Sequence, residues 1–173
     1  MNRHVRFSLL CLITGIGATG IANSADPVTI NITGNVIAAP CVVDGNNSIN
    51  VDLGEVPAPE LSAVDSSTPW KSFNLMVKNC PAGTSKVTAT FSGTPDRDGP
   101  LWRYLNTGTA KGIGVELAKV DSNTNLPNGT NWVVNVDSSR SATWSMRTRM
   151  VAMKGNATPG TVKAVVIATL TYQ

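Results

Sequence analysis

The stretch from Asp26 to Ala38 (DPVTINITGNVIA) alternates between apolar and polar side chains. Its even positions carry the small or apolar residues Val28, Ile30, Ile32, Gly34, Val36 and Ala38. Because successive side chains of a strand point to opposite faces, this period predicts an extended strand with one apolar face. The stretch exceeds the roughly 3–10 residues usual for a strand, and no tight turn follows it to fold a neighbour back as a hairpin. Its partner is therefore expected far away in the sequence, or in another molecule.

The same period of two recurs along the rest of the chain, whereas no convincing helical period occurs. The 15 Gly and 10 Pro residues separate short runs rich in Thr and Val. This spacing predicts an all-β fold, an antiparallel Greek-key sandwich. The final run is apolar on both faces in its middle, which is typical of a strand inside a sandwich or beside a sheet edge. The expected strands are 48–53, 71–80, 86–92, 113–120, 132–136, 142–153 and 160–173.

The chain length and charge indicate one nearly neutral domain. Once a leader is removed from the 173 residues, one domain remains that is large enough to bury its own core. Removing Arg3 and Arg6 with that leader leaves 12 basic residues against 11 acidic ones. The basic residues are dispersed, so we expect no nucleic-acid partner. Arg147 and Arg149 share one face of a predicted strand, and ordinary exposed residues are favoured there over a specific anion site.

Residues 1–24 are predicted to be a secretory signal peptide. Arg3, His4 and Arg6 precede the apolar run 7–16, and a region of small residues follows. Cleavage is expected after Ser24, with Ala22 and Ala25 as alternatives. The apolar run is shorter than the roughly 18–20 residues that a membrane-spanning helix needs, so the protein is expected to be exported.

Two cysteines, Cys41 and Cys80, remain after the leader is removed together with Cys11. An even pair in a protein sent to an oxidising compartment predicts a disulfide, whereas a free or metal-binding pair is the weaker alternative. In the chain-entropy description, closing a loop of about 40 residues stabilises a fold by roughly 3–4 kcal/mol.

The sequence offers little material for catalysis, metal binding or cofactor binding. The single histidine, His4, lies in the predicted leader, so His-assisted nucleophiles and His zinc sites are not expected. Asp96 and Asp98 stand in the segment DRDG, but the later ligands of a calcium loop are missing, and a turn is the preferred interpretation. No nucleophile elbow or glycine-rich phosphate loop is present. We expect no enzyme activity, no metal and no cofactor.

Several ordered segments together resemble a known family. These are GNVIAAPC near the start of the mature chain, then VDLGEV, then KNCPAGTSKVTATFSG, and a last strand that ends in TLTYQ. In this order they resemble the chaperone–usher pilins of the type 1 fimbrial family, over essentially the whole mature chain. The segments around Cys80 and Gly160 are most similar to the small adaptor subunits of the tip fibrillum, and the chain is too short for a two-domain tip adhesin.

The resemblance implies an incomplete immunoglobulin-like sandwich that lacks its seventh strand and is completed by a donor strand from another subunit. It divides the chain into the signal peptide 1–24, a donor extension 25–39 and a pilin domain 40–173. Its partners would be a periplasmic chaperone, an outer-membrane usher and neighbouring pilins, in a fimbrium on the cell surface. The donor residues would be Val28, Ile30, Ile32, Gly34 and Val36, and the acceptor groove would be lined by Val166, Ala168, Leu170 and Tyr172.

Elementary physics supports the same assignment. An extended strand without a local partner can add to a sheet edge, with main-chain hydrogen bonds along the strand and alternate side chains in pockets. The alternative is that residues 26–38 form the first strand of a self-complete sandwich. For the function, a carbohydrate- or protein-binding module is the second hypothesis, with the four tryptophans as candidate contact residues; a secreted hydrolase is the third.

Overall fold

The computed structural model describes residues 26–37, 39–45 and 47–173, so the predicted signal peptide lies outside the described residues. The chain divides after Asn35 into two units, which are considered separately. In the first unit, residues 26–35 are extended without regular secondary structure, and their side chains are exposed. Within the described ranges, no helix has the length and apolar character needed to cross a membrane.

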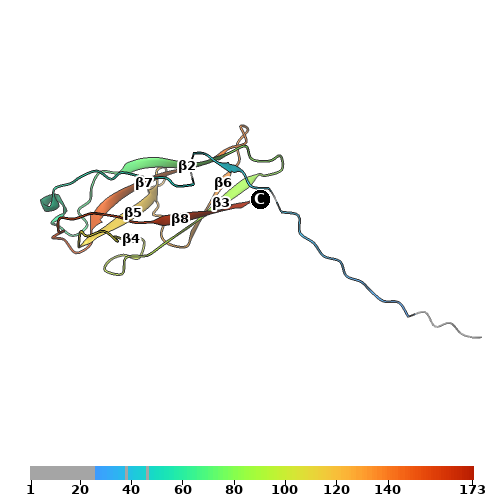
Figure 1. The fold of residues 1–173 in the computed structure, drawn as a ribbon, viewed down its shortest axis with the longest axis horizontal. Helices are drawn as coiled ribbons and strands as arrows, with labels where there is room; N and C mark the ends of the chain where they lie inside the picture. Colours follow the sequence, from blue (N-terminus) through green and yellow to red (C-terminus); the bar gives the residue numbers. More distant parts are fainter. Residues whose placement is uncertain (1–25, 38, 46) are drawn as a thin grey trace, which may run out of the picture. The chain divides into compact units, whose positions relative to one another are not determined.

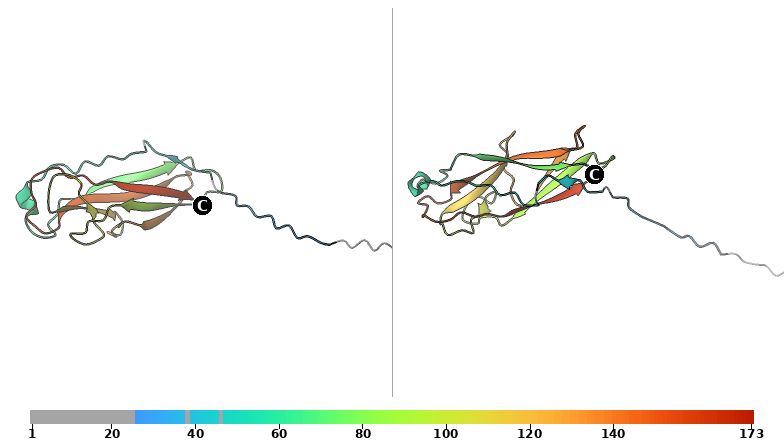
Figure 2. Two further views of the ribbon diagram at one scale, coloured as in Figure 1. Left: turned by 60° about the horizontal axis from the view of Figure 1, so that its bottom comes forward. Right: turned by 45° about the horizontal axis from the view of Figure 1, so that its top comes forward.

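The second unit, residues 36–173, is a sandwich of two antiparallel sheets (Figures 1 and 2). The larger sheet has the strand order β1-β2-β7-β5-β4, and the smaller has the order β6-β3-β8. A short 3-10 helix, Ala58–Leu61, precedes β2. The strands are β1 (Val42–Val43), β2 (Lys71–Lys78), β3 (Lys86–Gly93), β4 (Tyr104–Leu105), β5 (Ile113–Lys119), β6 (Thr130–Asn135), β7 (Ala142–Ala152) and β8 (Val166–Tyr172).

The core forms where the alternating apolar faces of the two sheets meet. On β7 the even residues from Ala142 to Met150 are buried, and the odd residues between them are exposed or half-buried, as the period of two predicts. The largest fully buried side chains are Trp144, Tyr104, Phe91 and Leu126. The predicted disulfide joins Cys41 to Cys80, with the two Cα atoms 4.2 Å apart, and both residues belong to this core.

Most of the predicted strands are present, with ends shifted by a few residues. Two predictions need correction. Segment 48–53 is not a strand, because no backbone hydrogen bond joins it to another segment in the part of the chain that the structure describes. The last strand begins at Val166 and not at Gly160, since the backbone of Thr161 and Lys163 pairs instead with the loop 106–110.

Candidate functional site: a groove beside the last strand

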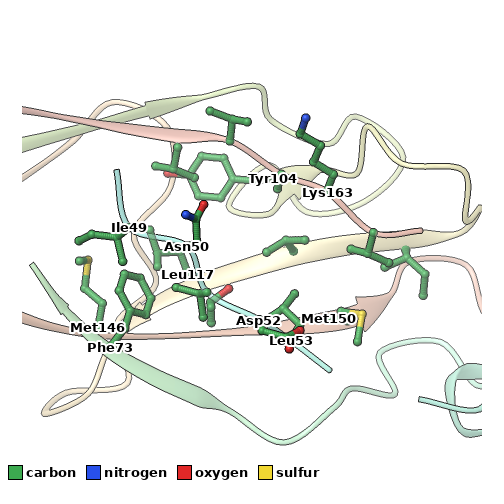
Figure 3. Close-up of a pocket in the computed structure, with 18 of the residues that line it drawn as sticks. Ile49, Asn50, Asp52, Leu53, Phe73, Tyr104, Leu117, Met146, Met150 and Lys163 are labelled. Carbon is green, nitrogen blue, oxygen red and sulfur yellow. The ribbon is translucent and has the colours of Figure 1, made fainter. Parts of the chain in front are cut away.

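A long groove runs along β8 between the two sheets, with a volume of about 1390 Å³ (Figure 3). One wall consists of alternate residues of the C-terminal segment, which are half-buried and contact the core. These are Val162, Ala164, Val166, Ala168, Leu170 and Tyr172. Small-molecule sites usually enclose about 300–1,000 Å³. The size and length of this groove therefore suit a stretch of polypeptide better than a small ligand.

The backbone of β8 leaves one side of the strand open to the groove. Lys86 and Gln173 exchange both of their backbone hydrogen bonds, at 3.0 and 2.9 Å. In an antiparallel pair, bonded and non-bonded residue pairs alternate, so the odd residues of β8 bond to β3. The even residues from Val166 to Tyr172 therefore direct their N–H and C=O groups away from β3. Since β8 is the last strand of its sheet, these groups form an unpaired edge.

The opposite wall is the extended segment 47–56, which also lacks a ladder partner. Its apolar residues Ile49, Val51 and Leu53 line the groove. Ile49 remains 43% exposed, while Val51 and Leu53 are half-buried. In the part of the chain that the structure describes, β8 and segment 47–56 thus face one another across the groove, and each has unpaired backbone groups. One additional strand between them would supply hydrogen bonds to both.

The floor of the groove is apolar and comes mainly from the larger sheet. Figure 3 shows Phe73, Leu117 and Met146 at its base. Tyr104 lines the groove as well, and its phenol O–H donates a 2.7 Å hydrogen bond to the backbone oxygen of Leu126. Burial raises the pKa of Tyr104 to about 12, and burial also raises the pKa of Tyr172 above its ordinary value. Both phenols are therefore neutral at physiological pH.

The predicted acceptor residues Val166, Ala168, Leu170 and Tyr172 all line the groove. Sequence reasoning missed Val162 and Ala164 on the same wall and Ile49, Val51 and Leu53 on the opposite one. The signal for both sets was present, because each continues an alternating apolar run. The expected donor side chains are exposed: Val28 by 82%, Ile30 by 78%, Ile32 by 90% and Val36 by 103%.

The aspartates and tryptophans considered from the sequence lie outside the groove wall and make contacts of their own. The Asp96 carboxylate accepts the Asp98 backbone N–H at 2.9 Å, and Lys154 Nζ lies 3.0 Å from Asp98 Oδ1, as in a hydrogen-bonded turn. The four tryptophans have different fates: Trp144 is fully buried, Trp132 packs partly against the core, Trp70 is half-buried and Trp102 is 43% exposed.

Comparisons with known proteins agree with this geometry. Residues 30–173 match the sequence profile of the family described as fimbrial protein. The chain is 40% identical over 155 residues to Protein FimG of Escherichia coli K12, which covers 90% of each chain. It is 36% identical over 170 residues to the S-fimbrial adhesin protein SfaS of Escherichia coli O6:K15:H31, covering 97% of this chain and 99% of the relative. The crystal structure of the P pilus rod subunit PapA superposes with a TM-score of 0.64 at 18% identity, covering 78% of this chain and all of PapA.

The fold and the groove define an immunoglobulin-like sandwich that is short of one strand. The chain belongs to the fimbrial protein family, and it is a pilin subunit of adhesive fimbriae, exported and assembled at the cell surface. The similarity to chaperone–usher pilins of the type 1 family, seen first in the sequence, is thereby confirmed.

Proposed function

We propose that this pilin polymerises by donor-strand complementation, with the groove beside β8 as acceptor and residues 26–36 as donor. The observation that supports this most strongly is the unpaired edge of β8, whose outward backbone groups and even side chains both face the groove. A strand bound in the groove would form backbone hydrogen bonds along this edge and would cover the apolar floor.

The dimensions of donor and acceptor agree. At about 3.3 Å per residue, the groove wall from Val162 to Tyr172 spans roughly 33 Å, and the donor from Val28 to Val36 spans roughly 26 Å. The four aliphatic donor side chains are almost fully exposed in the isolated chain. Burying each one contributes roughly 1.5–3 kcal/mol, so together they supply on the order of 6–12 kcal/mol before the entropic cost of ordering the strand.

The partners follow from having one donor and one acceptor on each chain. Each subunit inserts its extension into one neighbour and receives the extension of another, which produces an open, head-to-tail filament. Before assembly the groove needs a temporary occupant, because an open apolar edge invites aggregation. A periplasmic chaperone fills that role, and an outer-membrane usher exchanges it for the next pilin.

We assign this subunit to a minor or adaptor position, supported by its similarity to FimG over 90% of each chain. Its role is structural, with no catalytic step, and it needs no cofactor, metal or nucleic acid. The residues that matter for this role are those of the donor and the groove.

The experiment is to add a peptide with the sequence of residues 26–38 to a shortened subunit, residues 39–173, which keeps the groove and lacks the donor. At a peptide concentration of 100 times Kd, binding should stabilise the fold by about 2.7 kcal/mol. For a domain of this size the melting temperature should then rise by about 5–10 °C.

The matched control is a peptide of residues 26–38 that carries both Ile30→Asn and Ile32→Asn. This peptide has no continuous apolar face in any register, so it should leave the melting temperature unchanged. The proposal fails if the two peptides stabilise the subunit equally, or if neither stabilises it.

A further inference from the structure

The first part of the groove wall, residues 161–165, lies beyond the end of the smaller sheet. The β3–β8 ladder ends at the pair Gly93 and Val166, so β3 supports the wall only from Val166 onward. Before Val166 the neighbour of the wall is the loop 106–110, which connects β4 to β5 of the larger sheet. We call residues 106–110 the Asn106 loop. This end of the groove wall is therefore held by a loop and not by a strand.

The Asn106 loop gives the wall the hydrogen bonds that a neighbouring strand would give. The Thr107 backbone N–H donates to the Lys163 carbonyl oxygen at 2.8 Å. In the other direction, the Lys163 N–H donates to the Asn106 side-chain oxygen Oδ1, also at 2.8 Å. The Thr161 N–H likewise donates to Thr109 Oγ1 at 2.8 Å. In a sheet these acceptors would be backbone carbonyls, so two side-chain oxygens take the place of peptide groups here.

The Asn106 side chain is itself fixed by the loop. Its Oδ1 also accepts the Gly108 N–H at 2.8 Å, and its Nδ2 donates to the Ala110 carbonyl oxygen at 2.9 Å. The loop lies so close to the wall that a Cβ atom added at Gly108 would be 2.0 Å from the Thr161 carbonyl oxygen. Three hydrogen bonds restrict the rotamers of this half-buried side chain, so the acceptor that it offers to Lys163 is preorganised.

This arrangement directs the backbone of Val162 and Ala164 toward the groove. Thr161 and Lys163 use their N–H and C=O groups on the side of the Asn106 loop. Since backbone groups alternate along an extended chain, the even residues direct theirs to the opposite side. The even residues of β8 also have their unpaired groups on that side. The edge that can accept a donor strand therefore begins at Val162, before β8 itself.

The same end of the groove is apolar. Val162 contacts both the main core and a smaller apolar cluster that includes Leu61, Ile113 and Met150. Leu53, from the opposite wall of the groove, packs against this smaller cluster as well. A donor side chain at this end would therefore be buried among apolar groups while its backbone is hydrogen-bonded to the wall.

The length of the donor strand requires this extension of the wall. At about 3.3 Å per residue, β8 from Val166 to Tyr172 spans roughly 20 Å, whereas the proposed donor from Val28 to Val36 spans roughly 26 Å. The wall that begins at Val162 spans roughly 33 Å and accommodates the whole donor. A donor that lies within the wall therefore has one end beside the part that the Asn106 loop holds.

We infer that Asn106 is a positioning residue of the acceptor groove, an inference that rests on the proposed donor-strand function. Asn106 holds residues 161–165 in an extended conformation beside the loop. Val162 and Ala164 then continue the edge of β8 and bind one end of the donor. The other end of the donor binds beside β8, which β3 holds without help from Asn106.

The test measures how much each end of the donor contributes to binding. The exported subunit is used as it is recovered from the periplasm, and a labelled peptide of residues 26–38 is followed to equilibrium by fluorescence anisotropy. Three unlabelled peptides compete with it: residues 26–38, residues 30–38 and residues 26–34. The affinity of the full peptide divided by that of each shortened peptide gives the contribution of one end. Any protein that already occupies the groove cancels from these two ratios.

Asn106→Leu keeps the branched shape of the side chain and removes its oxygen acceptor. It should lower one of the two ratios by about tenfold, equivalent to about 1.4 kcal/mol, and leave the other unchanged. Asn106→Asp should retain most of that ratio, because a carboxylate oxygen still accepts from the Lys163 and Gly108 N–H groups. A substitution that merely loosened the whole sandwich would lower both ratios alike.

Asn131→Ala is the matched control. Asn131 Oδ1 also accepts a hydrogen bond at 2.8 Å, from the Thr90 hydroxyl, but it lies on β6, which β3 separates from β8. Both ratios should keep their parent values in this variant. Hydrogen exchange supplies a second measurement that needs no peptide: the Lys163 amide should exchange at least about tenfold faster in Asn106→Leu, while the amides of β7 exchange as in the parent.

The outcomes separate this inference from the proposed function. If the parent binds none of the three peptides, the donor-strand proposal fails, and the role of Asn106 fails with it. If the parent binds the peptides but Asn106→Leu leaves both ratios unchanged, or lowers both equally, only the inference about Asn106 is overturned. An Lys163 amide that exchanges at the parent rate in Asn106→Leu overturns it as well.

Discussion

Replacing Ile32 by Asn provides the most direct test of the donor strand. Ile32 is 90% exposed in the isolated chain, so its replacement should leave the fold of its own sandwich intact. Insertion into a neighbour's groove would bury the side chain, which contributes roughly 1.5–3 kcal/mol. An Asn side chain at the same position loses this burial free energy. It also buries an amide group without a hydrogen-bond partner, at a further cost of about 1–3 kcal/mol. The combined loss of about 2.5–6 kcal/mol corresponds to roughly two to four powers of ten in affinity.

The assay is competition between labelled and unlabelled peptides of residues 26–38 for the groove of the purified subunit, followed by fluorescence anisotropy. Thr33→Asn introduces the same side chain one residue away, on the opposite face of the strand, and should change the affinity only a few-fold. In the whole subunit, Ile32→Asn should block polymerisation and leave the melting temperature of the chaperone-bound form unchanged. The reasoning is refuted if the two peptides lose affinity equally, or if Ile32→Asn unfolds the subunit that carries it.

Gly34→Leu tests the same strand at its smallest position. A Cβ atom added at Gly34 meets no heavy atom within 4 Å in the isolated chain, so the substitution should not disturb the fold. In a shallow part of the groove the larger side chain would meet backbone, with an overpacking cost of roughly 1–3 kcal/mol. Assembly that proceeds at the parent rate in this variant would contradict a shallow site there.

Further predictions concern the pilin domain itself. Cys41→Ser should sharply lower the yield of periplasmic protein, because loss of the disulfide costs roughly 3–4 kcal/mol, and mass spectrometry of the parent should find no free thiol at Cys41. Tyr104→Phe leaves the Leu126 carbonyl without its 2.7 Å hydrogen bond and should cost about 1–3 kcal/mol at pH 7 in urea unfolding. Because the folded-state pKa of Tyr104 is raised to about 12 from 10.0, its contribution is fully present below pH 10 and lost between pH 10 and 12, so the parent and the variant should converge in that window. Gly93→Ala should lower the melting temperature through a cost of about 1–3 kcal/mol, since its Cβ would lie 2.8 Å from the Tyr104 ring, whereas Ser92→Ala should have little effect.

Truncation of β8 is a less specific test of the groove than a substitution in the proposed donor. Deleting Leu170 to Gln173 would remove part of the groove, but it would also remove the β8 residues that pair with β3. Gln173 itself is bonded to the backbone of Lys86 in both directions. A loss of chaperone capture after this truncation would therefore report unfolding as well as loss of the groove, so substitutions in the donor are the cleaner test.

The sequence predicted the strands whose neighbours lie in the same chain. On β7 the alternation identified the buried face correctly, because β2 and β5 pair with it on both sides. Segment 48–53 shows the same alternation, and Val51 and Leu53 are half-buried as expected, yet no strand forms there because no ladder partner is present in the described chain. An alternating pattern indicates which face of a segment is apolar, but it does not indicate whether a neighbouring strand is available to pair with that segment.

Other features could not be predicted because their cause is not local. β1 and β4 have two residues each, which is too short for a period to be visible. Glu116 stands between Val115 and Leu117, where alternation predicts an exposed side chain, but it is only 4% exposed because Arg103 and Arg149 cover it. The groove was predicted in part from the apolar C-terminal run, and its second wall needed the three-dimensional arrangement.

The position of the disulfide has a mechanical consequence for a filament of such subunits. The segment proposed as donor precedes Cys41 in the sequence, and Cys41 comes immediately before β1, which is held to β2 by only two residue pairs. Tension along the extension would peel so short a strand from its sheet one hydrogen bond at a time. The Cys41–Cys80 bond transmits the pull to the end of β2 before peeling can begin. Because of this covalent bond, β1 stays attached under load even if its own hydrogen bonds break. Single-molecule extension with and without reductant should therefore find early unravelling only in the reduced subunit.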